Sequence, residues 1–531
     1  MTRIPSRARQ FVLVPAFILL CALLGGIYGP RVTAQSDSSS TEVQNSLQSI
    51  GKVLHAVEEN YSDPVDPEKV LYQGAIPGML RTLDPHSNFF DPKSFSALRE
   101  EQRGRYYGVG MTVTPRNGKT IVLAPFVGSP AYKAGLRPGD VIVKVNDKVT
   151  DNLSTTEVAD MLKGPKGTAV RITVSREGSP EPLQFSIIRD EIPRASIEHA
   201  FFIQPGIGYL RIASFNETTS QELRDKLREL NPGSLKGLIL DLRNNPGGLL
   251  AEGVNVADMF LQKGQLIVSH RGRASREKRY TATRGNRGYD FPLVVLINRF
   301  SASAAEIVTG AIQDHDRGLV VGEASFGKGL VQTVYPLSEN SGLALTTAKY
   351  YTPSGRLIQR DYYNVSIYDY YTRKEGAAPA QSEVKSTDGG RTVYGGGGIT
   401  PDFEALEPKL NKFQENMARK YAFFNFSKRY LAENNGTIAR TFEVTDAVLA
   451  RFKKFLKEQD VAYEEADFAT NLDYVRQQIK LELFLSIFGM DEAYKLEAAA
   501  DTQILKGIQL LPQAAALEQN ARQVIARRDP Q

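Results

Sequence analysis

Two residues that can carry out acyl transfer lie near the middle of the chain. Ser303 stands in RFSASAAEI, which Asn298 separates from the preceding apolar run PLVVLI, and Lys328 stands in LVVGEASFGKG. A serine at a turn from a strand into a helix is where hydrolases present a nucleophile, because the helix dipole and the next N–H, that of Ala304, stabilise a developing oxyanion. A second explanation stays open, since Ser303 and Glu306 also match a capping box that only starts a helix.

A nucleophilic serine needs a base, and the histidines do not supply one for Ser303. His315 is flanked by aspartates, but it ends the helix that Ser303 would start, about 18 Å away. A lysine buried enough to be neutral can take this role, as in Ser-Lys variants of the catalytic triad. In an extended strand, side chains 328 and 332 share a face, so the Gln332 amide could orient the Lys328 amine.

The segment around Lys328 also resembles a phosphate-binding loop. Position 329 is glycine, however, where magnesium binding needs Ser or Thr, and LVQTVYPL alternates like a strand rather than opening a helix. We therefore do not expect a nucleotide. An ordinary glycine-rich turn with a solvated Lys328 remains the alternative.

A glycine pair follows the apolar run GLILDLR. Gly247 and Gly248 end this expected buried strand, where backbone N–H groups can point at a substrate oxygen and act as a second oxyanion donor. The sequence does not decide which of the two donates, and a simple strand-ending turn is the other explanation.

The amino terminus has the layout of an export signal or a membrane anchor. Arg3, Arg7 and Arg9 precede an apolar run over 11–28, so we expect 1–34 to be a signal or anchor and 35–41 a linker. Cleavage and retention both stay open. The rest of the protein should lie in the cell envelope, on the extracytoplasmic side. With 65 Lys+Arg against 60 Asp+Glu and no basic block, nucleic acid is not the expected partner.

The chain changes character along its length. We expect a helical region over 42–103, a β-rich module of short strands over 104–193, an α/β layer with a buried, largely parallel sheet over 194–405, and a helical region over 406–531. The single cysteine excludes an internal disulfide framework and a thiolate metal cage. A Ser-Lys mechanism requires no metal or nucleotide, so no cofactor is expected.

The stretch from Ser301 to Leu337 resembles the signature of the carboxyl-terminal processing proteases, also called tail-specific proteases. Their pattern is S-A-S-A-x-E followed by T/S-F-G-K-G, and similar segments occur at 84–87, 241–249 and 398–402. The resemblance implies that Ser303 is the nucleophile, Lys328 the general base and Gln332 the residue that orients it, with Ala304 and the Gly247–Gly248 loop as oxyanion donors. It also implies a ββα-type protease core with crotonase/Clp-like layers. Ala305 departs from the family pattern, in which many members have a second serine.

The segment GSPAYKAGLRPGDVIVKVNDKVT, at 128–150, resembles bacterial PDZ domains, inserted ahead of the α/β core. A glycine-containing loop beside a strand edge can bind a terminal carboxylate while the strand adds the peptide as a further strand. The candidate residues for this binding are Gly108, Val109, Gly110 and Met111, with Val158 and Leu162 as groove wall.

Together these features predict a multidomain, exported serine endopeptidase that recognises apolar C-terminal tails and processes or degrades envelope proteins. Its expected partners are protein substrates, the membrane through 1–34, and further copies of itself or a regulatory adaptor. A catalytically silent PDZ scaffold is the alternative, and it predicts loss of Ser303 or Lys328, both of which are present. A trypsin-like protease is disfavoured because no G-N-S-G-G segment occurs.

Overall fold

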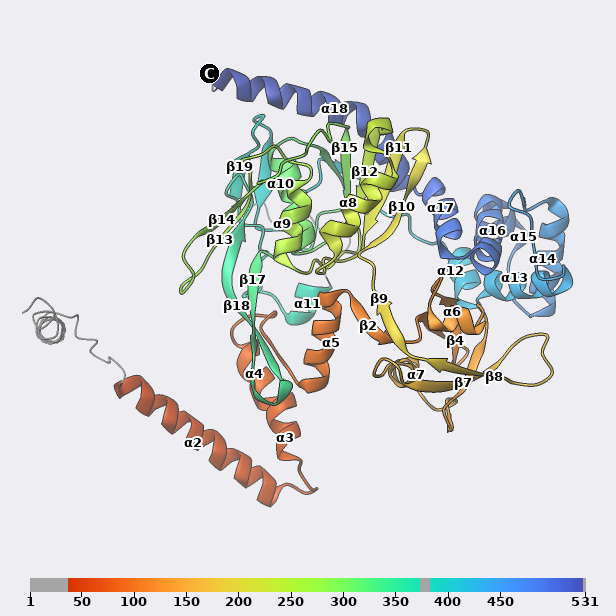
Figure 1. Cartoon of the computed structure of the whole chain (residues 1–531), viewed down its shortest axis with the longest axis horizontal. Helices are drawn as coiled ribbons and strands as arrows, with labels where there is room; N and C mark the ends of the chain where they lie inside the picture. The colour runs from red at the N-terminus through yellow and green to blue at the C-terminus, as the bar shows by residue number, and fades with distance from the viewer. Residues whose placement is uncertain (1–36, 373–382, 529–531) are drawn as a thin grey trace, which may run out of the picture. The chain divides into compact units, whose positions relative to one another are not determined.

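A computed structural model describes residues 37–372 and 383–528, which form two compact units divided after Met79 (Figure 1). The expected signal or anchor lies outside the described residues. The first helix of the described residues, α2 (Asp37–Asn60), begins inside the segment expected as a linker. Among the described residues, no helix is both long and apolar enough to cross a bilayer.

The amino-terminal elements are helical, as the sequence predicts. They are α2, α3 (Pro67–Val70), a π-helical turn (Leu71–Ala75), α4 (Ile76–Arg81), the short strand β1 (Asn88–Phe90) and α5 (Pro92–Arg103). Asp66 and Asp91 cap α3 and α5 by accepting hydrogen bonds from backbone N–H groups of the first turn, and a proline follows each cap at a position where no N–H is needed.

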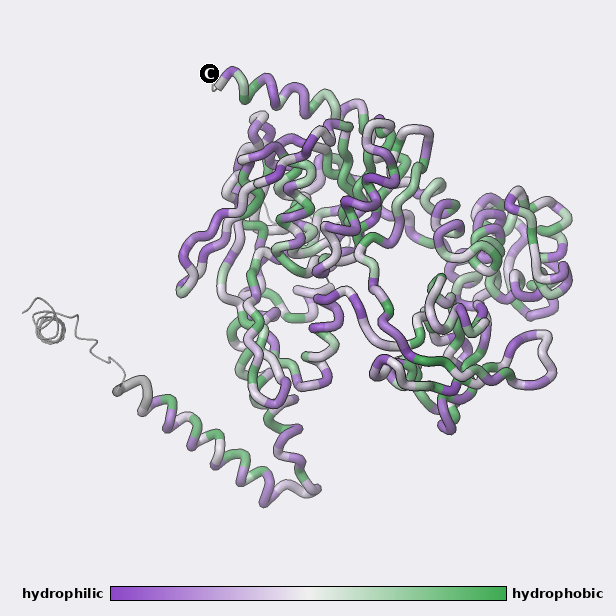
Figure 2. Tube along the Cα trace, viewed as in Figure 1, coloured by the Kyte–Doolittle hydropathy of each residue, from purple (hydrophilic) through white to green (hydrophobic). Residues whose placement is uncertain are grey.

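A six-stranded, largely parallel sheet forms the centre of the second unit, as predicted for 194–405. Its strands in spatial order are β10 (Ile197–Gln204), β11 (Ile207–Ile212), β12 (Gly237–Asp241), β15 (Leu293–Ile297), β16 (Leu319–Gly322) and β21 (Phe403–Glu404). Only the β10–β11 pair is antiparallel. These strands read as continuous apolar runs because both faces of the sheet are covered, and Figure 2 shows the hydrophobic colour following β12 and β15.

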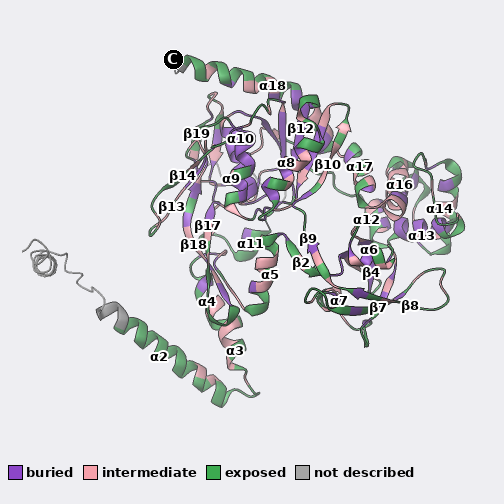
Figure 3. Ribbon diagram, in the orientation of Figure 1, coloured by how far each residue is buried: buried purple, intermediate pink, exposed green. Residues whose placement is uncertain are grey.

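Helices cover the two faces and make a three-layer core. One face packs on α8 (Thr219–Glu229), α9 (Leu250–Asp258) and α10 (Ala304–Asp314) through one set of alternating strand residues, such as Leu240 and Val295. The opposite set, such as Ile239 and Val294, packs on α17 (Met490–Ala500) and α18 (Thr502–Arg528). Every residue of α10 is buried, as the purple ribbon in Figure 3 shows.

A second, antiparallel sheet lies beside the core, and the sequence did not predict it. It contains β1, β13 (Leu266–Arg271), β14 (Lys278–Thr281), β17 (Leu330–Pro336) and β18 (Gly342–Tyr351). The strand after Lys328 therefore belongs to this sheet and not to the parallel one. The smaller elements of the core are two 3₁₀ turns (Pro232–Ser234 and Ser338–Asn340), α11 (Ile367–Tyr371), β19 (Glu383–Ser386) and β20 (Thr392–Gly395).

The β-rich module is inserted between α5 and β10. It enters through β2 (Arg105–Gly108) and leaves through β9 (Asp190–Pro193), which pair with each other, so both connections lie side by side. Its other elements are β3 (Met111–Arg116), β4 (Lys119–Pro125), α6 (Pro130–Ala134), β5 (Val141–Val145), β6 (Lys148–Val149), α7 (Thr155–Leu162), β7 (Ala169–Ser175) and β8 (Leu183–Ile188). In its sheet β3 is an edge strand.

The carboxyl-terminal region is helical, as predicted, and it has its own aromatic-rich core. Its first helices are α12 (Lys412–Arg419), α13 (Ala422–Glu433), α14 (Asp446–Glu458), α15 (Glu465–Thr470) and α16 (Leu472–Phe488). This helical body contacts the β-rich module, where the Arg116 guanidinium lies 3.5 Å from the ring centre of Phe424 and Lys428 Nζ lies 2.7 Å from Glu177 Oε2.

Candidate active site

Ser303 occupies a strained turn between β15 and α10. Its backbone angles are φ 54 and ψ −114, which a residue with a side chain rarely adopts. An ordinary helix cap has an extended backbone, so a cap alone does not explain this conformation. A strained serine at the end of a buried strand and the start of a helix is the arrangement of a nucleophile elbow.

Two backbone N–H groups beside Ser303 have no acceptor within the described residues. They belong to Ala304, the first residue of α10, and to Gly248, whereas the N–H of Gly247 donates to Asn245 Oδ1 at 2.8 Å. The glycine loop lies against the elbow, since a Cβ on Gly247 would lie 2.7 Å from Ser303 Cβ. The sequence did not decide between Gly247 and Gly248 as the second oxyanion donor. Because the N–H of Gly247 is already bonded, Gly248 is the better candidate.

Gly248 could not be another residue without displacing the loop. Its φ is 142, and a Cβ there would lie 2.0 Å from the carbonyl oxygen of Phe215. The backbone on either side is bonded to that residue, because Phe215 donates to the Gly247 carbonyl at 2.9 Å and accepts from Leu249 at 2.8 Å. This close approach of two backbones holds the free N–H in one direction.

Lys328 lies between two glycines in the loop that precedes β17. Burial lowers the pKa of its amine, while the negative charges of Glu306 and Asp84 act to raise that pKa. The net direction is downward, so a larger share of this lysine is neutral near neutral pH than of a solvated one. A neutral amine is the form that can accept a proton from a serine hydroxyl.

The carboxylate of Glu306 connects the turn at Ser303 with the loop that carries Lys328. It is fully buried and accepts hydrogen bonds from the N–H groups of Ser303 at 2.8 Å, Gly327 at 2.7 Å and Lys328 at 2.9 Å, and from Ser325 Oγ at 2.5 Å. Burial raises the pKa of Glu306, and the four hydrogen bonds oppose that rise. The sequence marked Glu306 only as a capping residue and did not predict this bridge.

Tyr350, on β18, joins the same two loops, and no motif in the sequence pointed to it. Its hydroxyl lies 2.6 Å from the carbonyl oxygen of Lys328 and 3.1 Å from that of Ser303. Within the described part of the chain, no hydrogen bond joins Ser303 Oγ to Lys328 Nζ. Glu306 and Tyr350 thus bring the backbones of the two residues together, without a direct bond between their side chains.

Gln332 does not contact Lys328 through a hydrogen bond in this structure. Its amide donates to Thr346 Oγ1 at 3.2 Å. The same-face argument assumed a regular strand from 328 to 332, but β17 begins at Leu330 and its pairing with β18 shifts between Val331 and Gln332. A bulge of this kind changes the direction of the side chains that follow it. The orienting role of Gln332 stays a prediction.

His86 and Asp84 lie near the lysine, although the sequence gave them no chemical role. His86 Nε2 is 2.7 Å from the Tyr370 hydroxyl, and burial, followed by the charge of Lys328, lowers the His86 pKa to about 4. Asp84 accepts hydrogen bonds from the N–H of His86 and from the N–H and hydroxyl of Ser87. This turn therefore places a neutral imidazole and a carboxylate beside the amine.

The expected tail-binding residues lie together in the β-rich module. Within the described residues, the N–H groups of Val109 and Gly110 have no acceptor, as a carboxylate-binding loop requires. Met111 begins the edge strand β3, whose outer side is open to a further strand. Val158 and Leu162, on α7, are buried in the core of the module, and their role as groove wall stays a prediction.

Family models match four parts of the chain. The model of peptidase family S41 matches residues 206–367, and a PDZ domain model matches residues 121–176. A C-terminal helical domain of probable PDZ-proteases matches residues 413–467, and the N-terminal domain of the activating protease CtpB matches residues 29–94.

Curated relatives match over most of their length. The chain is 41% identical over 336 residues to the carboxy-terminal-processing protease of Bartonella bacilliformis, covering 62% of this chain and 76% of that protein. It is 29% identical over 463 residues to the carboxy-terminal processing protease CtpA of Bacillus subtilis, covering 86% and 97%. Among solved structures, the photosystem II D1 C-terminal processing protease is 32% identical, with a TM-score of 0.35 and coverage of 66% and 85%.

Proposed function

This chain belongs to the carboxy-terminal processing proteases of peptidase family S41, serine-type enzymes with a PDZ domain, and we propose that it hydrolyses peptide bonds with Ser303 as nucleophile and Lys328 as general base. The observation that carries this proposal is the buried Glu306 carboxylate, which accepts hydrogen bonds from the backbone N–H groups of both residues. One side chain then fixes the relative position of the nucleophile and its base.

In the proposed mechanism, the neutral amine of Lys328 takes the hydroxyl proton of Ser303 as Oγ attacks the scissile carbonyl carbon. The N–H groups of Ala304 and Gly248 donate to the oxyanion that forms. The Lys328 ammonium then returns its proton to the leaving amine, and the new carboxyl terminus stays attached to Ser303 as an ester. Water, deprotonated by Lys328, hydrolyses this ester.

Proton transfer requires Lys328 Nζ to come within about 2.6 to 3.2 Å of Ser303 Oγ, either directly or through a water molecule. These atoms are not hydrogen-bonded in the described structure, so we propose that the amine moves toward Oγ when substrate binds. The amide of Gln332 would then leave Thr346 and orient the amine, as the family resemblance implies.

The PDZ domain is proposed to select substrates by an apolar carboxyl terminus. The terminal carboxylate would accept hydrogen bonds from the free N–H groups of Val109 and Gly110, and the tail would pair with the open edge of β3. The apolar side chains of the tail would lie between β3 and α7, near Val158 and Leu162.

The test compares the wild type, Ser303→Ala and Lys328→Ala on an unfolded reporter protein that ends in small apolar residues. We expect both variants to lose cleavage, while Lys349→Ala, which changes an exposed lysine on β18, keeps it. Undiminished cleavage by either variant would contradict the proposed roles of Ser303 and Lys328. A wild-type protein that binds the reporter without cutting it would favour the silent scaffold instead.

Residues 1–34 are proposed to direct the chain to the cell envelope, with the protease on the extracytoplasmic side and envelope proteins as its substrates. The arginines followed by an apolar run support this location. Cell fractionation with protease protection tests it, and a product recovered only from the cytoplasm would exclude it.

We further propose that the protein associates with itself or with an adaptor through its terminal helical regions. On α2, exposed apolar residues recur at helical spacing, among them Val43, Leu47 and Ile50, which are 59%, 62% and 49% exposed. Sizing the soluble protein with and without residues 406–531 tests the carboxyl-terminal part, and the same monomeric mass in both would refute self-association through it.

A further inference from the structure

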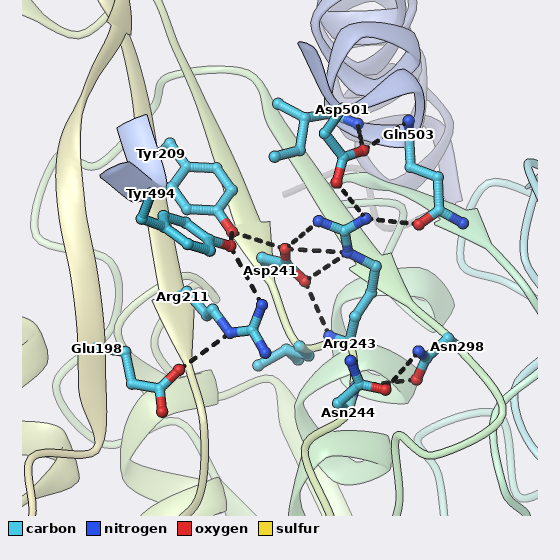
Figure 4. A network of polar contacts seen from close by, with 12 residues as sticks. Glu198, Tyr209, Arg211, Asp241, Arg243, Asn244, Asn298, Tyr494, Asp501 and Gln503 are labelled. Atoms are coloured by element: carbon cyan, nitrogen blue, oxygen red, sulfur yellow. Dashed lines mark hydrogen bonds and ion pairs between the residues drawn. The ribbon is translucent and has the colours of Figure 1, made fainter. Parts of the chain in front are cut away.

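Arg243 opens the glycine loop, and its guanidinium bonds to two separate parts of the chain. On one side Nε and Nη2 bond to Asp241, at the end of β12, with the shortest contact at 2.6 Å. On the other side Nη1 lies 2.8 Å from Asp501 Oδ2 and 2.5 Å from Gln503 Oε1 (Figure 4). The loop is thereby fastened to residues more than 250 positions away in the sequence.

The carboxyl-terminal partners are fixed in turn by their own helix. Asp501 lies between α17 and α18, and its Oδ1 accepts hydrogen bonds from the N–H groups of Gln503 at 2.8 Å and Ile504 at 3.0 Å, which caps α18. The amide of Gln503 donates to the carbonyl oxygen of Ala405 at 2.5 Å. Each oxygen of Asp501 therefore has a different task, and only Oδ2 serves Arg243.

Helix α17 reaches the same ion pair from a second direction. The Tyr494 hydroxyl lies 2.7 Å from that of Tyr209, which donates to Asp241 Oδ2 at 2.7 Å. Burial acts to raise the pKa of Asp241, but the charge and hydrogen bonds of Arg243 outweigh it and lower that pKa overall. The pair is thus charged, and a charged buried pair needs every hydrogen bond that surrounds it.

The residues after Arg243 bond directly to the nucleophile elbow. The N–H of Asn244 donates to Asn298 Oδ1 at 2.9 Å, the two side-chain amides also bond to each other, and Ala302 donates to the carbonyl oxygen of Asn245 at 2.9 Å. The free N–H of Gly248 lies at the end of this short segment. A shift of Arg243 would therefore move Gly248 relative to Ser303.

We propose that Asp501 and Gln503 are positioning residues of the protease, which hold the oxyanion-donating loop in register with Ser303 through the guanidinium of Arg243. This inference rests on the proposed Ser-Lys function and assigns to the carboxyl-terminal region a part in catalysis without contact with substrate. A displacement of about 1 Å in a catalytic group can reduce a rate about 100-fold, so a small shift is sufficient.

The experiment uses the full chain and the variant Asp501→Asn. Asparagine keeps an oxygen that can cap α18 but loses the charge that faces Arg243, which separates the two tasks of the residue. The control is Arg522→Gln. Arg522 lies on α18 and forms ion pairs with Asp290 and with Glu518 of the same helix, and it does not bond to the glycine loop among the described residues. Both variants are measured on a peptide substrate and with a peptidyl boronate, whose tetrahedral adduct places an oxygen in the oxyanion site.

We expect Asp501→Asn to reduce kcat by about tenfold or more with KM unchanged, and to weaken boronate binding by a similar factor. Asp501→Glu should have a higher kcat and a higher boronate affinity than Asp501→Asn, because it keeps the negative charge. Arg522→Gln should behave as the wild type. A merely structural role would lower the melting temperature without a matched loss of boronate affinity. Equal kcat and boronate affinity in Asp501→Asn and Arg522→Gln would overturn the proposal.

If Asp501→Asn does not fold, Gln503→Ala tests the proposal instead, since it removes the other carboxyl-terminal contact of Arg243. Its kcat and its boronate affinity are then compared with those of Arg522→Gln. A failure of the proposed Ser-Lys mechanism would give a different experimental result. A wild-type protein whose cleavage is unaffected by Ser303→Ala would contradict the Ser-Lys mechanism, and with it the positioning role.

Discussion

The N–H of Lys328 donates to Oε2 of Glu306 at 2.9 Å, although 22 positions separate the two residues in the sequence. The same oxygen accepts the N–H of Ser303 at 2.8 Å. Because Glu306 is fully buried in the first turn of α10, its carboxylate cannot shift without moving the helix. The spacing between the backbones of Ser303 and Lys328 is therefore set by hydrogen bonds to one side chain, and within the described residues those bonds do not include the Lys328 amine.

Glu306→Gln tests this arrangement. A carboxamide can accept at only one end, so some of the four donors that now face Glu306 would meet an NH₂ group. We expect a loss of about 1 to 3 kcal/mol in the free energy of unfolding, because buried donors are left unsatisfied. We also expect kcat to fall by about tenfold to 100-fold, measured on folded protein, because the two loops separate.

The matched control is Glu252→Gln. Glu252 is also largely buried, and its carboxylate accepts hydrogen bonds from the N–H of Ser220 at 2.7 Å and from Asn255 at 2.8 Å rather than from the Ser303 and Lys328 loops. This variant should lose stability and keep its kcat. The bridging role of Glu306 would be rejected if the two variants lost activity in the same proportion as stability.

The pH dependence of cleavage should report the Lys328 amine. Since the base must be neutral, kcat/KM should fall as pH decreases through the Lys328 pKa, which burial holds below its ordinary value of 10.5. The negative charge of Asp84 acts to raise this pKa. In Asp84→Asn, the pKa should drop further, and the acidic limb of the kcat/KM profile should move to lower pH.

Asparagine is a suitable replacement because the N–H groups of His86 and Ser87 both donate to Oδ1 of Asp84, which the amide oxygen can replace. Asp91→Asn, at the cap of α5, is the control and should leave the profile in place. A shift to higher pH in Asp84→Asn would contradict the assigned electrostatics, and no shift would mean that another group controls the acidic limb.

Much of the fold follows from patterns that are local in the sequence. The apolar runs at 237–243 and 292–297 predicted the buried parallel strands β12 and β15, because burial on both faces leaves a continuous apolar run in the sequence. The helical pattern over 406–531 likewise predicted helices in that region, among them α16. The antiparallel sheet contains two pairs of strands that are adjacent in the chain, β13 with β14 and β17 with β18. The pairings that join these pairs and β1 into one sheet connect segments distant in the chain, and such pairing has no local signature.

The sequence could name candidate residues by their type, but it could not predict the hydrogen bonds around them. Ser303, Lys328 and the glycine pair were predicted as site residues from spacing and resemblance, and these roles stay predictions. The engagement of the Gly247 N–H with Asn245, the bulge before Gln332 and the contact of Arg243 with Asp501 all depend on the side-chain directions that the complete fold imposes. Sequence spacing carries no information on these.

Tail recognition should depend on the shape of the loop at Gly110. This glycine has φ 77, and a Cβ there would lie 2.5 Å from Ser129 Cβ, so Gly110→Ala must displace the loop whose N–H groups would hold the terminal carboxylate. We expect a loss of about tenfold or more in affinity for an apolar tail peptide, measured by fluorescence anisotropy.

Gly118→Ala is the control for backbone strain. Gly118 has φ 72 in the turn between β3 and β4, but a Cβ there would meet no atom within 4 Å. The two variants bear similar strain and differ only in the clash. Equal affinities in both would mean that the loop at Gly110 does not bind the tail.

The stability of the core should fall in acid because of His86. Its pKa is about 4 in the folded protein against an ordinary value of 6.5, so the unfolded state binds a proton more readily in this interval. The contribution is present above pH 6.5 and is lost as pH falls through about 4, with a total of up to about 3 kcal/mol. Urea unfolding followed by circular dichroism at pH 7 and pH 4.5 measures it.

His86→Gln removes the titrating ring, and its amide can still bond to the hydroxyl of Tyr370. This variant should therefore lose less free energy of unfolding between pH 7 and pH 4.5 than the wild type does. His55→Gln, which changes an exposed histidine on α2, should keep the pH dependence of the wild type. An acid dependence that stays the same in His86→Gln would show that the part-buried imidazole of His86 is not the group that titrates.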